Sequence, residues 1–124
     1  IAIEASEQCE RLTIPEIFDL KKIKDVIESW DKKRIILYGD ETIRKRDEIK
    51  FDFQNFHSKS LGAILIGPEG GFNNDEINYL RKKPFIKPID LGPRILKSDT
   101  AVITTLVLWH CLRGNMKKYT QFNN

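Results

Sequence analysis

Two glycine-containing loops hold the residue types best suited to ligand chemistry in this sequence. The first is GPEGG (67–71), which follows an apolar run, and the second is LGPRIL (91–96), which follows another. Glycine accepts positive φ and allows a ligand to approach the main chain closely. In open α/β sheets, ligands bind outside the carboxyl ends of the strands, where such loops lie. The two loops together predict a wall of N–H and C=O groups that can recognise an adenine by its edge.

Neither loop has the pattern of a phosphate-binding motif. No Gly-Lys-Ser or Gly-Lys-Thr follows the first loop, Glu69 would repel a phosphate, and the GxGxxG dinucleotide pattern is absent. An ordinary turn between a strand and a helix remains the alternative interpretation of each loop. Phe72, directly after the first loop, is expected to pack beneath the turn, with stacking on a base as the second option.

The side chains in and beside the loops offer charge stabilisation more clearly than proton transfer. Arg94 is the only arginine in either loop. It stays protonated and cannot act as a base, but it can stabilise negative charge, hold a phosphate or brace the loop. Glu69 and Asp99 can each accept a proton, although Asp99 also suits the N-terminus of a helix. We assign no catalytic base. His57 and His110 lack partners at metal or triad spacing, and no metal site is predicted.

A sheet with flanking helices must position these loops, and the apolar pattern predicts one. The predicted elements, in chain order, are helices at 2–12 and 19–32, a strand at 34–39, a short helix plus loop at 40–60, a strand at 61–67, a helix at 73–83, a strand at 85–92 and a helix at 98–113. The second helix rests on an apolar face that begins at Leu20, and an Asn caps the helix at 73–83. Pro88 places its strand near an edge or a bulge. Strands alternating with helices predict an α/β fold with a mainly parallel sheet and flanking helices.

The last helix, SDTAVITTLVLWHCLRGN, has almost no polar face. It begins with Ser98 as a capping residue and stops at Gly114. One sheet covers only one side of a helix, so a second subunit is expected to cover the rest. This pattern predicts a homodimer, with Leu108 as an outward-facing residue.

Composition limits the classes of protein that remain. The chain has 124 residues, enough for one domain, and a net charge of +3 that permits contact with nucleic acid. The basic clusters at 32–34, 44–46 and 81–83 can contact RNA phosphates or form solvated surface. Two cysteines are too few for a disulfide framework and no apolar run is long enough for a membrane span, so reduced thiols in a cytoplasmic protein are expected.

Three ordered stretches, EASEQCERLTIPEI, IGPEGGF and LGPRIL, together resemble the ribosomal RNA uridine-N3 methyltransferases of the SPOUT superfamily. The resemblance runs from about Ile1 to Leu112. It implies a SPOUT-like fold with a C-terminal trefoil knot, a rare exception to the rule against knotted chains. It also implies S-adenosylmethionine as the cofactor, a homodimer, and transfer of a methyl group to N3 of a uridine in small-subunit ribosomal RNA.

The resemblance implies the following site residues. The cofactor-binding residues are Leu37, Gly39, Ile66, Gly67, Pro68, Glu69, Gly70, Gly71, Leu91, Gly92, Arg94, Ile95, Leu96 and Thr100. Arg94 is also the candidate for stabilising charge during transfer. Candidate RNA-binding residues are Glu7, Gln8, Arg11 and Lys97, of which the first three can equally form a solvated helical face. The family usually has Arg and Glu where this chain has Lys97 and Asp99, and Lys cannot form the bidentate fork of Arg.

The resemblance further implies that residues 1–124 form a methyltransferase domain that lacks its first strand and helix. The N-terminal PUA-like RNA-binding domain of the family is also expected to be missing. A truncated non-catalytic remnant, or an RNA-binding module with the same fold, is therefore the alternative function. A different α/β enzyme with a nucleotide-like ligand is the third hypothesis, and only the two glycine turns support it.

Overall fold

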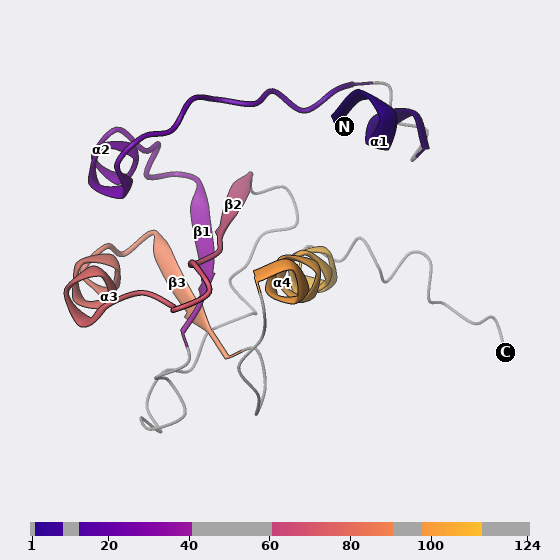
Figure 1. The fold of residues 1–124 in the computed structure, drawn as a ribbon. Helices are drawn as coiled ribbons and strands as arrows, with labels where there is room; N and C mark the ends of the chain where they lie inside the picture. Colours follow the sequence, from indigo (N-terminus) through magenta and orange to yellow (C-terminus); the bar gives the residue numbers. More distant parts are fainter. Residues whose placement is uncertain (1, 9–12, 41–60, 91–97, 113–124) are drawn as a thin grey trace, which may run out of the picture. The chain divides into compact units, whose positions relative to one another are not determined.

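The computed structural model describes residues 2–8, 13–40, 61–90 and 98–112 (Figure 1). The chain divides into two compact units, Ile1–Trp30 and Asp31–Asn124. The predictions for 9–12, 41–60, 91–97 and 113–124 lie outside the described residues.

The first unit holds two short helices, α1 (Ala2–Gln8) and α2 (Ile23–Glu28). The predicted helix at 19–32 is too long, because the chain is still extended at Lys22, the N-cap residue of α2. Leu20 is fully exposed in this extended segment, so its placement on an apolar helical face was wrong. A longer helix would put Lys21 and Lys22 in its first turn, where positive charge opposes the helix dipole. At the other end, the Ser29 hydroxyl donates to the Asp25 carbonyl at 3.0 Å.

The second unit is built on a three-stranded parallel sheet with the order β2-β1-β3. The strands are β1 (Ile35–Gly39), β2 (Gly62–Leu65) and β3 (Ile86–Ile89). Both strand pairs of the described residues are parallel, which confirms the predicted α/β class. Each strand is shorter than the apolar run that predicted it. Pro88 lies on β3, an edge strand of this sheet, where a residue without an N–H is tolerated.

Helix α3 (Asn74–Arg81) connects β2 to β3 and packs against β3. Its start confirms the predicted Asn cap. The Asn73 side chain accepts a hydrogen bond from the Glu76 amide at 2.8 Å, and the Glu76 carboxylate accepts one from the Asn73 amide at 2.9 Å. This capping box fixes the direction in which α3 leaves the sheet.

Helix α4 (Ser98–Leu112) contacts β1 and β2, and Figure 1 shows it on the side of the sheet opposite to α3. Leu37, Ile89 and Trp109 form the core between this helix and the sheet, with Ile35, Ile64 and Leu108 packed around them. Leu108 therefore faces the core, and its predicted outward orientation was wrong.

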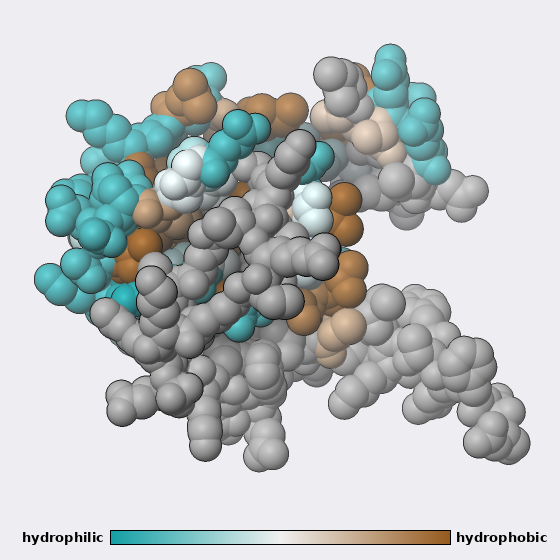
Figure 2. Space-filling view, turned by 60° about the horizontal axis from the view of Figure 1, so that its bottom comes forward, coloured by the Kyte–Doolittle hydropathy of each residue, from teal (hydrophilic) through white to brown (hydrophobic). Residues whose placement is uncertain are grey.

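The outward face of α4 carries Ile103, Leu106 and Val107, which are 65%, 41% and 48% exposed. The opposite stripe, at a spacing of four residues, contains the buried Ala101, Thr105 and Trp109. Figure 2 shows that hydrophobic side chains, coloured brown, reach the surface of the described residues. The sheet thus covers one side of this apolar helix and leaves the other exposed. Within the described ranges, no helix is long and apolar enough to cross a membrane.

Candidate ligand-binding site

The carboxyl ends of the three parallel strands meet at one edge of the sheet, and the first glycine loop leaves from there. It follows β2 directly, and its turn is closed by the Gly71 amide, which donates to the Pro68 carbonyl at 2.8 Å. Gly71 has φ +74°, a backbone conformation that residues other than glycine adopt only at a cost in free energy. The sequence-based prediction of a tight glycine turn at a strand end is confirmed.

The outer side of this turn is open. A Cβ atom placed on Gly70 or on Gly71 would meet no heavy atom of the described residues within 4 Å. Pro68, Glu69 and Gly70 are exposed. A ligand can therefore approach the main chain of the turn closely, which is what the glycines were predicted to permit.

The inner side of the turn rests on an aromatic ring. A Cβ atom on Gly67 would lie 3.0 Å from Cε2 of Phe72. The Phe72 ring in turn meets the Tyr38 ring edge-on, with centroids 6.2 Å apart and planes at 77°. Phe72 thus packs beneath the turn, the first of the two options considered from the sequence.

A buried polar cluster lies below this ring, at the end of β1. The Asp40 side chain has no exposed surface, and its Oδ2 accepts hydrogen bonds from the Tyr38 hydroxyl and Arg81 Nε, both at 3.0 Å, and from Arg81 Nη2 at 2.5 Å. Burial, and then the charge of Asp40, raise the pKa of Tyr38 to about 12. Tyr38 therefore remains a neutral hydrogen-bond donor throughout the physiological range.

Sequence reasoning missed this cluster. It placed Arg81 in a surface cluster at 81–83 that can contact RNA phosphates, but Arg81 is 16% exposed and paired with Asp40. The sequence signal was weak: a carboxylate directly after an apolar strand, and an arginine at the end of a helix far along the chain.

The predicted cofactor residues divide into four groups. Gly39 ends β1, and Ile66 with the 67–71 turn follows β2, so the sheet brings these residues to one edge. Leu37 has no exposed surface and its side chain belongs to the core. Thr100 is exposed near the start of α4. The following predicted residues lie outside the described part of the chain: Arg11, Leu91, Gly92, Arg94, Ile95, Leu96 and Lys97.

The remaining candidates have defined positions. Glu7 and Gln8 are exposed on α1, in the first unit. The Asp99 carboxylate accepts a hydrogen bond from the Thr100 amide at 2.9 Å, which supports the helix-terminal role considered for it. Among the described residues, no group of three His, Cys, Asp or Glu side chains can hold a metal ion.

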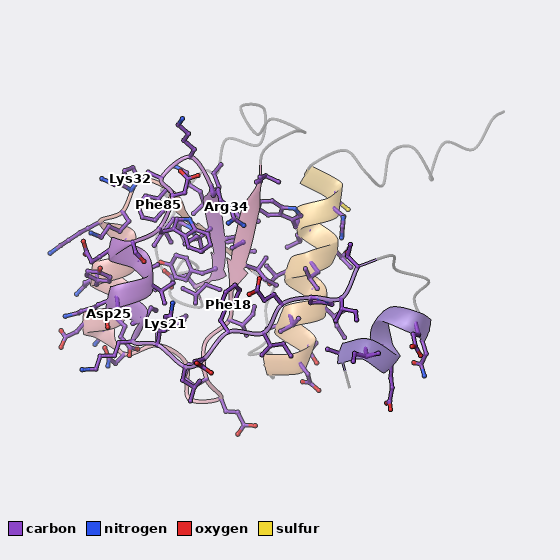
Figure 3. All side chains as sticks on the ribbon, turned by 90° about the horizontal axis from the view of Figure 1, so that it is seen from above. Phe18, Lys21, Asp25, Lys32, Arg34 and Phe85 are labelled. Atoms are coloured by element: carbon purple, nitrogen blue, oxygen red, sulfur yellow. The ribbon has the colours of Figure 1, made fainter. Side chains whose placement is uncertain are left out.

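The opposite edge of the sheet, where the strands begin, is basic. Exposed Lys32 and Lys33 precede β1, and exposed Lys82 precedes β3 in the neighbouring position. Figure 3 labels Lys32 and Arg34, which lead into β1, and Phe85, which leads into β3. Because β1 and β3 are neighbours, two basic stretches far apart in sequence lie at the same edge of the sheet, an arrangement that can contact phosphates.

Fold and site together define the class: an α/β domain with a parallel sheet, helices on both faces, and an open glycine turn at the carboxyl edge. The RNA methyltransferase domain family matches residues 1–110. The chain belongs to this family.

Individual relatives agree with this assignment. The chain is 38% identical over 104 residues to the ribosomal RNA small subunit methyltransferase E of Rickettsia conorii, covering 84% of this chain and 41% of that protein. It is 40% identical over 118 residues to the protein of the same name from Buchnera aphidicola subsp. Schizaphis graminum, covering 94% and 45%. The chain therefore spans less than half the length of these relatives.

The fold is also found among solved structures. A putative methyltransferase from Legionella pneumophila, in complex with the bound cofactor SAM, superimposes with a TM-score of 0.69 at 28% identity. The match covers 89% of this chain and 43% of that one.

Proposed function

We propose that this chain is an S-adenosylmethionine-dependent methyltransferase domain that acts on N3 of a uridine in small-subunit ribosomal RNA. The observation that carries the proposal is the open glycine turn at the carboxyl edge of the sheet. Two relatives named as ribosomal RNA small subunit methyltransferases, and a similar structure that contains bound SAM, support it.

The main chain of the 67–71 turn fits a cofactor that presents a flat adenine edge. Open space above Gly70 and Gly71 leaves room for the ligand, and the ring of Phe72 supports the turn from below. When bound, S-adenosylmethionine supplies the methyl group. Glu69, within the turn, is exposed and is available to a positively charged ligand.

The acceptor places a different demand on the protein. Uridine N3 carries a weakly acidic proton, and its loss leaves negative charge on the uracil ring that positioned donors must stabilise. We assign this role to Arg94 in the second loop, because a guanidinium donates hydrogen bonds and keeps its charge. The basic edge formed by Lys32, Lys33 and Lys82 is suited to the phosphates of the same RNA.

We also propose that the domain acts as a homodimer, in the cytoplasm, with its C-terminal segment forming a trefoil knot. The exposed apolar face of α4, formed by Ile103, Leu106 and Val107, supports a second copy of the chain as its cover. Sedimentation equilibrium tests the dimer. Val107→Asp is expected to give monomers, whereas a wild-type chain that is monomeric at high concentration contradicts the dimer.

Titration calorimetry with S-adenosylmethionine tests the cofactor site. Gly70→Val adds a branched side chain where the described residues leave open space, so the fold should tolerate it while the ligand meets an obstacle. The affinity should fall by about tenfold or more, which corresponds to about 1.4 kcal/mol. Asn78→Val, on the exposed side of α3, is the matched control and should bind as the wild type does.

Transfer is then measured with labelled cofactor and small ribosomal subunits. Methylation at uridine N3 blocks Watson–Crick pairing, so reverse transcription stops at the modified position. Label in the RNA together with such a stop supports the proposal. Cofactor binding without transfer would instead favour the non-catalytic alternative, and unchanged affinity in Gly70→Val would remove the turn from the site.

A further inference from the structure

We propose that Arg81, Asp40, Tyr38 and Phe72 form a positioning network that fixes the shape of the 67–71 turn. As a role in cofactor binding, this inference rests on the proposed function. As a statement about the turn, it rests on contacts within the second unit alone.

The network starts at a buried carboxylate. All three hydrogen bonds to Asp40 converge on its Oδ2, one from Tyr38 and two from Arg81. A buried charge is costly unless it is paired. Moving Tyr38 or Arg81 away would leave the Asp40 carboxylate without that partner, so the carboxylate holds both side chains in place. The Asp40 amide also donates to the Ile89 carbonyl at 3.1 Å, which ties the carboxylate to β3 as well as β1.

Tyr38 passes this restraint to the turn. Its hydroxyl is bonded to Asp40 at 3.0 Å, and its ring meets the ring of Phe72. Because Tyr38 is fully buried, neither end of its side chain can move without disturbing a neighbour.

Phe72 touches the turn at both ends. It directly follows Gly71, and its ring lies beneath Gly67. A shift of this ring therefore changes the path of the chain on both sides of the exposed glycines.

The contacts form a closed circuit. After Phe72, the capping box of Asn73 and Glu76 fixes the start of α3, and the last residue of that helix is Arg81, which returns to Asp40. Buried ion pairs often add little net stability compared with apolar packing, but they can select one arrangement over others. The Asp40–Arg81 pair lies beneath the 67–71 turn, so the arrangement that it selects is one shape of the proposed binding site.

The test measures the turn itself before any ligand. Hydrogen exchange of the Gly71 amide, read by NMR, reports how often its hydrogen bond to the Pro68 carbonyl opens. Phe72→Leu removes the ring contact, and the double variant Asp40→Asn with Arg81→Gln replaces the ion pair by neutral groups that can still hydrogen-bond. Both should speed exchange at Gly71 by about tenfold, which corresponds to about 1.4 kcal/mol, because the turn loses contacts that hold it closed.

A matched control separates positioning from general stability. Ile35→Val removes a carbon from the core on the α4 side of the sheet, at the start of β1 and away from the turn, so it should lower the melting temperature without changing local opening at Gly71. Tyr38→Phe removes only the hydroxyl and should have an effect between the control and the double variant. If Gly71 exchanges at the wild-type rate in Phe72→Leu and in the double variant, the network does not position the turn and the proposal is overturned.

Cofactor affinity is the second measurement. We expect S-adenosylmethionine to bind about tenfold more weakly to the network variants than to Ile35→Val, since the ligand must then order the turn itself. A wild-type chain that does not bind the cofactor contradicts the proposed function, but the exchange rates at Gly71 still decide whether the network positions the turn.

Discussion

The two ends of strand β2 use glycine in opposite ways. At its start, Gly62 lies under the indole of Trp109, and a Cβ atom there would lie 1.9 Å from Cη2 of that ring and 2.6 Å from the Ile35 carbonyl. Beyond its end, Gly70 and Gly71 have open space around them in the described part of the chain. Gly62 allows the indole ring to pack against the strand, whereas Gly70 and Gly71 leave the main chain accessible to a ligand. The surroundings of a glycine must therefore be known before it can be assigned to a binding site.

The largest effect is expected at the packed end. Gly62→Ala must push the Trp109 ring away or displace the backbone of β1 at Ile35, and overpacking of this kind costs about 1–3 kcal/mol, with the upper end expected for so close a contact. Chemical denaturation of the variant and the wild type gives the difference. A variant of wild-type stability would mean that the indole can move away freely, and the contrast between the two ends would fail.

The support beneath the open end is expected to depend on alkaline pH. Tyr38 has a pKa of about 12 in the folded chain, against 10.0 for an unperturbed tyrosine, so the unfolded tyrosine ionises first as the pH rises. Its contribution is fully present below pH 10 and is lost between about 10 and 12, by about 2–3 kcal/mol at most. The stability difference between wild type and Tyr38→Phe should shrink across this range. A constant difference would show that the hydroxyl is not buried.

A smaller effect is expected at Gly71. Alanine there has room but must adopt φ +74°, which costs about 1–2 kcal/mol for a residue with a side chain. The free energy of unfolding should therefore fall less than in Gly62→Ala. An equal loss in the two variants would indicate that Gly71 is also closely packed.

The smallest effect is expected at Gly70. Alanine there meets no atom of the described residues within 4 Å and needs no left-handed backbone, so the stability should change by about 0.5 kcal/mol or less. The same chemical denaturation experiment covers all three glycines. A large loss at Gly70 would contradict the open character of this end.

The sequence predicted the sheet well because its strands carry simple signals. IILYG and GAIL are short apolar runs that end in glycine or lead toward it, and β1 is covered on both faces. The Asn73 cap and the glycine turn were also predictable, because both depend on neighbouring residues. Arg94 and the rest of the second loop lie outside the described residues, so their predicted roles stay predictions.

Three features were beyond local reasoning. The Asp40–Arg81 pair depends on how α3 crosses the sheet, which no spacing in the sequence encodes. Leu108 was assigned to the wrong face because an almost uniformly apolar helix carries no periodicity to distinguish its sides. Leu20 extended an apolar pattern past the point where the chain becomes helical.

The strand order has a consequence for synthesis of the chain. β1 is central, yet it is made first, and its partners come much later: Ile35 pairs with Gly62, and Ile36 pairs with Ile86. Among the described strands no pair can form as a local hairpin, so closure of long loops must precede any gain from their pairing, and folding is expected to be slow. Until β3 has left the ribosome, the apolar β1 keeps an unpaired edge that can associate with other chains. The nascent domain is therefore most exposed to aggregation before its glycine turn has been positioned.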